Sequence, residues 1–175
     1  WVKASALQEE PAVIALRHKI HQHPELGNQE FETSKLVAER LKSLGIEVRT
    51  NVANTGVIGV LKGSKPGPVM ALRADMDALP VQEPVGLPFA STARAQYQGK
   101  EVPVMHACGH DAHTAMLLGA AKLLADHRDQ IAGRDPQQVV LVAHRVVGAV
   151  GDELGGVRAR HVGRGVLLDI RGLLH

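Results

Sequence analysis

The sequence contains a single cysteine among 175 residues, and only 2% of its residues are aromatic. One cysteine excludes a disulfide bond within the chain. No apolar run approaches the ~20 residues that a membrane-spanning helix needs, so we expect no membrane partner. The formal net charge is only +2, and no basic run alternates with aromatic residues, so we expect no nucleic-acid partner.

What is present fits an ordinary globular domain. Hydrophobic residues make up 45% of the chain and charged residues 22%, and this length can bury one good core. The sequence does not fix the cellular compartment. Two expectations remain: cytoplasmic, or periplasmic or secreted if a signal peptide preceded Trp1.

The residue types that bind metals are concentrated in Met105–His113. This stretch holds three histidines, one aspartate and the only cysteine, Cys108. Thiolate and imidazole are the preferred ligands of zinc and similar divalent metals, and Cys108 and His110 have the spacing of a turn. A helix is expected to begin near Asp111, which would cap it or hold a ligand imidazole. The alternative is a small buried cysteine among surface histidines.

Two aspartates follow a short apolar stretch that we expect to be a strand buried on both faces, 69–72. Asp75 and Asp77 are two residues apart and would point the same way if the strand continued. They are candidates to orient metal ligands, because α/β folds place their chemistry at strand ends. The alternative is an ion pair with Arg73 and a turn.

Periodicity and turn residues predict the remaining elements. We expect helices at 4–23, 29–44 and 111–127, strands at 46–52, 55–61, 139–143 and 166–170, and an ordinary surface loop at 81–104. Pro24 ends the first helix, and His21 lies at this end. From residue chemistry alone, His21 and His23 are interpreted as a solvated helix end, where histidines are favourable.

Several stretches together resemble one known family. They are Leu16–His21 with Pro24-Glu25-Leu26, Thr55–Val57, Gly67–Pro80 and Met105–His113. In their order and spacing, the chain resembles the amidohydrolase branch of the zinc-dependent exopeptidases. This branch includes hippurate hydrolases, N-acyl-amino-acid amidohydrolases, auxin-conjugate hydrolases and related carboxypeptidases. The resemblance covers residues 16 to about 133.

The resemblance implies an α/β catalytic domain with a mixed sheet flanked by helices, into which a smaller lid domain is inserted. Residues 1–175 would then be a partial catalytic domain, truncated and without the lid. Family members are often homodimers. The resemblance also places His21 and Pro24-Glu25-Leu26 near the site without assigning them a role.

The resemblance further implies two divalent metals per site. Zinc is the expected metal, with manganese, cobalt or nickel as alternatives. Cys108 and His110 match metal ligands, and Asp77 matches an aspartate that supports the ligands from behind. His175 corresponds less closely to a further ligand histidine. Asp75, His113, His21 and His144 are possible lining residues of the site.

Residues 143–171 diverge from the family pattern. After the strand, the family carries two glutamates, the first a general base and the second a metal ligand, whereas Ala143–Ala149 contains no carboxylate. His144 is a candidate base or ligand, and the alternative is a strand-end histidine near solvent. Composition also shifts, since all eight lysines lie at or before Lys122.

These observations leave two main functions open. The first is a metal-dependent hydrolase that cleaves the amide bond of N-acyl amino acids or short peptides through metal-activated water. The alternative is a catalytically inactive truncated remnant that keeps the fold and one metal and serves as a binding or structural module. A thiol or redox enzyme that uses Cys108 is a weaker third candidate, because the chain has no resolving cysteine.

Overall fold

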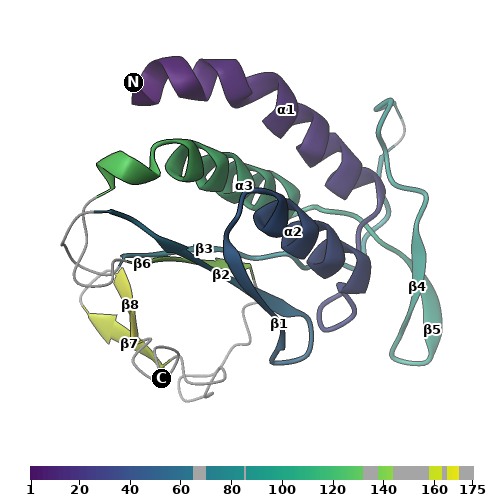
Figure 1. The fold of residues 1–175 in the computed structure, drawn as a ribbon. Helices are drawn as coiled ribbons and strands as arrows, with labels where there is room; N and C mark the ends of the chain where they lie inside the picture. The colour runs from purple at the N-terminus through teal and green to yellow at the C-terminus, as the bar shows by residue number, and fades with distance from the viewer. Residues whose placement is uncertain (65–69, 85, 132–137, 144–157, 163–164, 170–175) are drawn as a thin grey trace.

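The computed structural model describes residues 1–64, 70–84, 86–131, 138–143, 158–162 and 165–169. It confirms the α/β class with a mixed sheet (Figure 1). The helices are α1 (Val2–Gln22), α2 (Phe31–Ser43), α3 (His110–Asp126) and the short 3₁₀ helix η1 (Arg128–Gln130). The strands are β1 (Glu47–Val52), β2 (Gly56–Lys62), β3 (Met70–Ala74), β4 (Arg94–Tyr97), β5 (Lys100–Pro103), β6 (Gln138–Ala143), β7 (Arg158–Val162) and β8 (Gly165–Asp169).

The main sheet has the strand order β1-β2-β6-β3. β1 pairs with β2 and β2 with β6 in antiparallel fashion, whereas β3 and β6 are parallel. Ala74 at the end of β3 is in register with Ala143 at the end of β6. Parallel strands end at the same edge of a sheet, so the chain leaves both strands where α/β folds place their sites.

The prediction that residues 69–72 form a strand buried on both faces is wrong for the described sheet. β6 inserts between β2 and β3, which leaves β3 at an edge with Met70 exposed. The strand buried throughout is β2, where only Lys62 is exposed. An apolar run shows that a strand is half-buried or better, but it does not give the position of that strand in the sheet.

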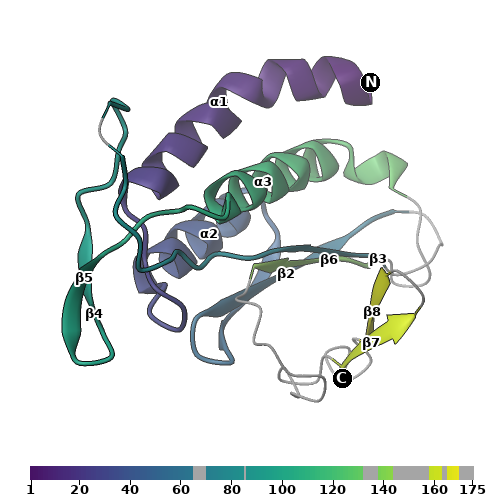
Figure 2. The ribbon, with the colours of Figure 1, turned by 180° about the vertical axis from the view of Figure 1, so that it is seen from behind.

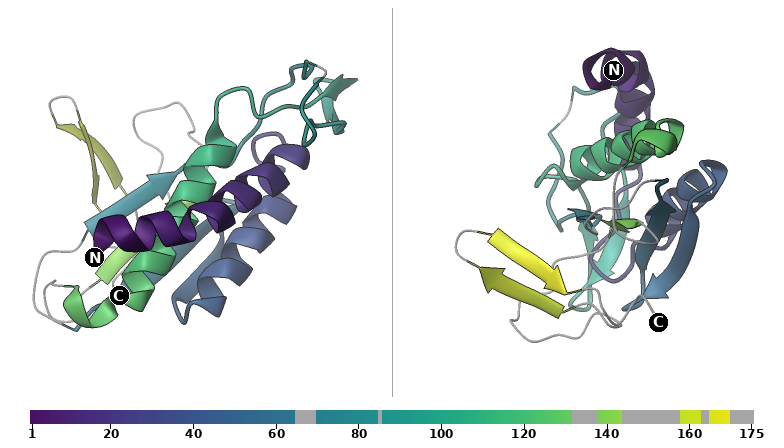
Figure 3. Two further views of the ribbon diagram at one scale, coloured as in Figure 1. Left: turned by 90° about the horizontal axis from the view of Figure 1, so that it is seen from above. Right: turned by 60° about the vertical axis from the view of Figure 1, so that its left-hand side comes forward.

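Among the described residues, the three long helices cover one face of the sheet, and the hairpin β7–β8 lies on the other side (Figures 1 and 2). The expected flanking by helices is therefore seen on one face only. The buried core joins α2, α3 and the sheet and includes Leu41, Leu61 and Leu118. Seen from above, α1 crosses α3 (Figure 3). A Cβ atom on Gly119 would lie 2.6 Å from the Val13 side chain, so only glycine permits this crossing.

The expected surface loop at 81–104 is in part wrong. It contains the antiparallel hairpin β4–β5, which stands at one end of the molecule (Figure 1). Beneath the hairpin, Leu26, Ala78 and Val104 form a second small buried cluster. The prolines and glycines of this stretch favoured a loop over short strands. The sequence feature that could have predicted the hairpin is the set of apolar residues Ala93, Ala95 and Val102, which pack on this cluster.

Local sequence signals predicted the bounds of the three long helices to within two residues. α1 ends two residues before Pro24, as the proline predicts, and Gly45 follows α2 with φ +67. None of the helices in the described part of the chain is long and apolar enough to cross a membrane.

Candidate metal centre

Residues 105–110, here called the metal loop, follow β5 and end at the first residue of α3. The loop begins beside the segment that follows β3, because Leu79 and Met105 exchange two backbone hydrogen bonds of 3.0 Å. The next helix begins at His110. The two stretches richest in candidate site residues, separated by a long excursion in sequence, therefore lie side by side.

Gly109 gives the metal loop its turn. It precedes α3 with φ +80 and ψ 18, a left-handed conformation that side chains with a Cβ atom adopt only at a cost. A Cβ atom there would meet nothing within 4 Å, so the requirement for glycine is conformational and not steric. This turn separates Cys108 from the helix that carries His110.

His110 is held from behind by Asp77. Its Nδ1 lies 2.8 Å from the Asp77 carbonyl oxygen and 3.1 Å from the Asp77 Oδ1. A carbonyl oxygen only accepts, so Nδ1 carries the hydrogen and the Nε2 of the neutral ring keeps its lone pair. This is the arrangement in which proteins prepare a histidine for a metal ion. Asp77 therefore contacts the Nδ1 side of His110, and its role behind a metal ligand stays a prediction.

Asp75 and Asp77 have different partners, because β3 ends at Ala74 and the strand alternation stops there. The Arg73 guanidinium donates to the Asp75 Oδ1 at 3.0 and 3.1 Å. Asp75 thus forms the ion pair considered as the alternative for it. Its backbone carbonyl accepts a 2.9 Å hydrogen bond from Thr114 Oγ1, which attaches this strand end to α3.

Cys108 is an exposed free thiol on the metal loop. His113 is also exposed, one turn along α3, with its ring centroid 6.0 Å from that of His110. No group of three His, Cys, Asp or Glu side chains is arranged to hold a metal within the described ranges. Cys108 and His110 are therefore two donors of suitable chemistry that need others. His144 and His175 lie outside the described residues.

Asp111 neither caps α3 nor holds a predicted ligand. It is fully buried, and its Oδ2 accepts hydrogen bonds from His21 Nδ1 at 2.8 Å and Arg17 Nε at 3.1 Å. Burial alone would raise the pKa of Asp111, but the hydrogen bonds from His21 and Arg17 outweigh it and lower that pKa. The imidazole that Asp111 does hold is that of His21, which lies 90 positions earlier in the sequence and is not one of the two predicted ligands.

The interpretation of His21 as a solvated helix end is wrong, although it fits His23, which is exposed. His21 is 3% exposed, and its Nε2 lies 2.7 Å from Glu83 Oε1. Since both of its partners are carboxylates, both ring nitrogens act as donors. Burial lowers the pKa of His21, but the hydrogen bonds to Glu83 and Asp111 raise it above its ordinary value.

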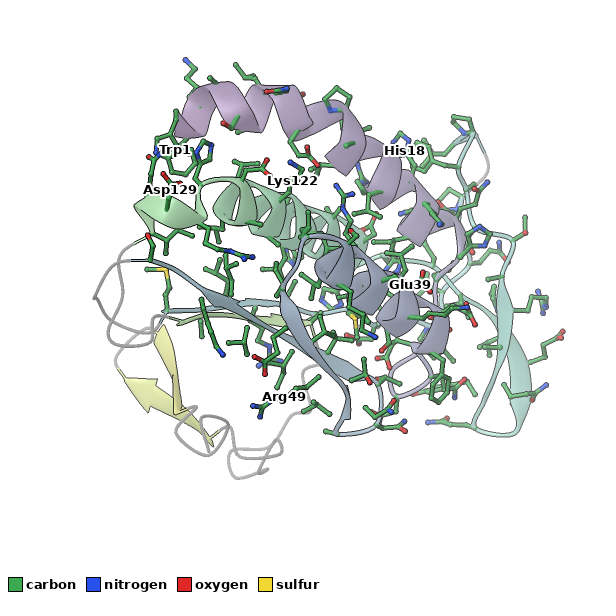
Figure 4. The ribbon with its side chains drawn as sticks, in the orientation of Figure 1. Trp1, His18, Glu39, Arg49, Lys122 and Asp129 are labelled. Carbon is green, nitrogen blue, oxygen red and sulfur yellow. The ribbon has the colours of Figure 1, made fainter. Side chains whose placement is uncertain are left out.

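Glu83 was missed by sequence reasoning, because it lies in the stretch interpreted as a surface loop. It is buried, and its Oε2 accepts the backbone N–H of Ser91 at 2.5 Å. Phe89 of the same stretch contacts two histidines of α1. Its ring stacks on His18 at 3.8 Å and meets the edge of His21 at 5.5 Å. Figure 4 labels His18 on the face of α1 toward this loop.

His106 is buried beside these groups, with its ring centroid 6.3 Å from that of His21. Neither of its ring nitrogens has a hydrogen-bond partner among the described residues, and the same holds for Asp111 Oδ1. Burial lowers the pKa of His106 to about 4, with His21 and His110 adding to the effect against the attraction of Asp111. His106 is therefore neutral at pH 7.

Glu25 has a structural role. Its carboxylate accepts the N–H groups of Glu32 and Thr33 at 3.0 and 2.8 Å, and these groups open α2. The Glu25 carbonyl oxygen accepts the N–H of Ala78 at 2.8 Å. The stretch after α1 therefore ties the start of α2 to the segment that carries Asp77.

Comparison with known proteins agrees with this geometry. Residues 71–144 match the model of the peptidase family M20/M25/M40. The thermostable carboxypeptidase 1 of Saccharolobus solfataricus is 50% identical over 133 residues, which cover 75% of this chain and 32% of that protein. The hippurate hydrolase of Campylobacter jejuni is 53% identical over 110 residues, which cover 63% of this chain and 27% of that protein.

A solved structure extends the comparison. The Bacillus subtilis YXEP protein, a dinuclear metal-binding peptidase of the M20 family, superposes with a TM-score of 0.65 at 41% identity. The match covers 81% of this chain and 35% of that one. The chain thus spans about a third of the length of the proteins it matches. The motifs, the fold and these matches agree with one another, and residues 71–144 carry the pattern of the peptidase family M20/M25/M40.

Proposed function

We propose that this chain carries part of the active site of a metal-dependent hydrolase that cleaves the amide bond of N-acyl amino acids or short peptides. The observation that carries the proposal is His110, whose Nδ1 is held by Asp77 while its Nε2 keeps a lone pair, two residues after the exposed thiol of Cys108. Names of similar proteins support the substrate class, since they include a carboxypeptidase and a hippurate hydrolase.

The chain's own residues would prepare the site in three ways. Cys108 and His110 bind a divalent metal, for which zinc is the best match to a thiolate and an imidazole. Asp77 fixes the tautomer and the direction of His110. Gly109 sets the turn that places the two donors on either side of a helix start. A divalent metal supplies Lewis-acid catalysis and activates water at neutral pH.

The first experiment measures zinc per chain on washed protein, with Cys108→Ser in parallel. We expect about one or two equivalents, lost in the variant. Hydrolysis of hippurate, abolished by a chelator and restored by zinc, then tests the reaction. A wild-type chain that binds no metal would contradict the proposal at its first step.

A non-catalytic module that keeps one metal is the second candidate. It is favoured by one observation, the absence of a carboxylate from the sequence Ala143–Ala149, which begins at the last residue of β6. General-base catalysis typically contributes ~10²–10⁴-fold. Zinc bound without any chelator-sensitive hydrolysis of hippurate would favour this candidate over the first.

A further inference from the structure

A continuous path of hydrogen bonds runs behind the metal loop and joins its two ends. The path runs from Asp111 to His21, Glu83, Ser91 and Val104. Because the metal loop itself closes this path, we call these five residues the buried ring. Asp111 follows the loop, and Val104 precedes it. The remaining link is the 2.8 Å hydrogen bond that Ser91 Oγ donates to the Val104 carbonyl oxygen.

All members of the buried ring are shielded from solvent. Their exposed fractions run from 0% for Asp111 to 8% for Ser91. His21 lies between two buried carboxylates, and Arg17 adds a second positive charge at Asp111, so two positive groups face two negative ones. Hydrogen bonds between charged groups are the strong ones, and a buried charge that loses its partner is costly. The path therefore resists opening at the two links that His21 makes.

The ring spans elements that are far apart in sequence. His21 comes from the end of α1, Glu83 and Ser91 from the stretch before β4, and Asp111 from the first turn of α3. The ring includes neither Cys108 nor His110, so its hydrogen bonds leave these two candidate donors unused. What it fixes is the distance between the residue before the metal loop and the residue after it.

We propose that His21 is a positioning residue of the metal loop, since by joining Asp111 to Glu83 it fixes both ends of residues 105–110 and so presents Cys108 and His110 together. The part of this inference that concerns metal rests on the proposed function. The part that concerns the conformation of the loop does not.

The metal part is tested with cobalt as the probe on the whole chain. Cobalt bound to a thiolate gives a charge-transfer absorption band, which reports on Cys108. His21→Asn keeps an amide near the position of Nδ1 but loses the link to Glu83. We expect about tenfold weaker cobalt binding and a weakened thiolate band, as for other changes behind metal ligands.

His23→Asn is the matched control. It removes the same side chain two residues further along, at an exposed position outside the ring. It should bind cobalt like the wild-type chain, with an unchanged band. Equal affinity and an equal band in His21→Asn would overturn the proposal.

The loop part is tested without metal by amide hydrogen exchange in a chelator. Two amides report on the loop, because Met105 donates to Leu79 and Ala107 donates to Met105. In His21→Asn both should exchange about tenfold faster, while amides at the centre of β2 follow global stability only. If the wild-type chain binds no cobalt, the proposed function fails, but this measurement still decides the role of His21.

A general loss of stability must be separated from a loss of position. Leu41→Ala removes a fully buried side chain far from the ring and lowers global stability. The two variants are compared at urea concentrations that give equal global stability. Faster exchange at Ala107 in both would mean that His21 has only a general structural role and would overturn the proposal. Faster exchange in His21→Asn alone supports it.

Glu83→Gln tests the ring at a second link. It cuts the charged contact to His21 but touches neither the metal loop nor Asp111. We expect weaker cobalt binding and faster exchange of the loop amides, as in His21→Asn. The effect of the double variant His21→Asn/Glu83→Gln should not exceed about the larger of the two single effects, because substitutions within one network are not additive. Fully additive effects on cobalt binding would contradict a shared path through His21.

Discussion

Inward-facing and outward-facing side chains of residues 105–113 differ in how deeply they are buried. Inward, Asp111 is fully buried and held by two cationic partners. Outward, Cys108 and His113 are exposed. His110 lies between the two sides, with one ring nitrogen bound to Asp77 and the other without a hydrogen-bond partner among the described residues.

The difference separates two tasks within nine residues. The inward side chains fix where the segment lies, and substitutions there should be felt mainly as stability. The outward side chains carry the chemistry and should be replaceable at little cost to folding. A metal site needs both properties, because ligands that must release water and accept a metal cannot be used up in permanent hydrogen bonds.

The largest expected effect is the loss of Asp111. In Asp111→Ala, the buried imidazole of His21 faces no carboxylate on that side, so we expect about 3–5 kcal/mol of lost stability in urea unfolding. Asp75→Ala is the control, since it breaks a more exposed pair with Arg73. It should cost less than about 1 kcal/mol. Similar losses in both variants would contradict the separation of the two sides.

The next largest effect is a loss of folding stability in acid that comes from His106. Its pKa is about 4 in the folded chain and 6.5 ordinarily, so the unfolded chain takes up the proton first as pH falls. Stability should fall between pH 6.5 and about 4, by roughly 3 kcal/mol at ~1.4 kcal/mol per pKa unit. Urea unfolding in a chelator measures this loss, and His106→Asn should remove it.

His21 gives the opposite sign in another pH window. Its pKa is raised in the folded chain, so its stabilisation is complete below pH 6.5 and is lost as pH rises through the raised value. The pH of maximum stability is then expected near 6.5. His23→Asn should leave the fall in stability on both sides of this maximum unchanged, because that side chain is exposed. Stability that rises steadily toward acid would contradict the burial of a neutral His106.

A smaller effect is expected at the turn between the two sides. Gly109→Ala forces a Cβ atom into a left-handed conformation without any steric clash, so we expect about 1–2 kcal/mol of lost stability. Gly109→Asn should lose less, since asparagine tolerates this conformation. Equal losses in the two variants would mean that the backbone conformation is not the cause.

Sequence patterns gave the helices, the class of sheet and the two candidate donors, because each depends on neighbours in sequence. Pro24 ends α1, and Gly45 ends α2, as local rules require. The buried contacts between His21, Glu83 and Asp111 could not be predicted in this way. They join residues that are 62 and 90 positions apart, and nothing near Glu83 in sequence distinguishes it from a solvated loop residue.

The smallest expected effect on stability is that of His113→Ala, a variant that tests whether His113 is a ligand of the metal site. The side chain is exposed on α3, so urea unfolding should change by no more than about 0.5 kcal/mol. Its ring lies beside that of His110, yet no three donors are grouped in the part of the chain described here. Cobalt binding should therefore stay close to that of the wild-type chain, while Cys108→Ser loses it. If His113→Ala loses cobalt as fully as Cys108→Ser does, His113 is itself a ligand. The outward side would then supply three donors within six residues.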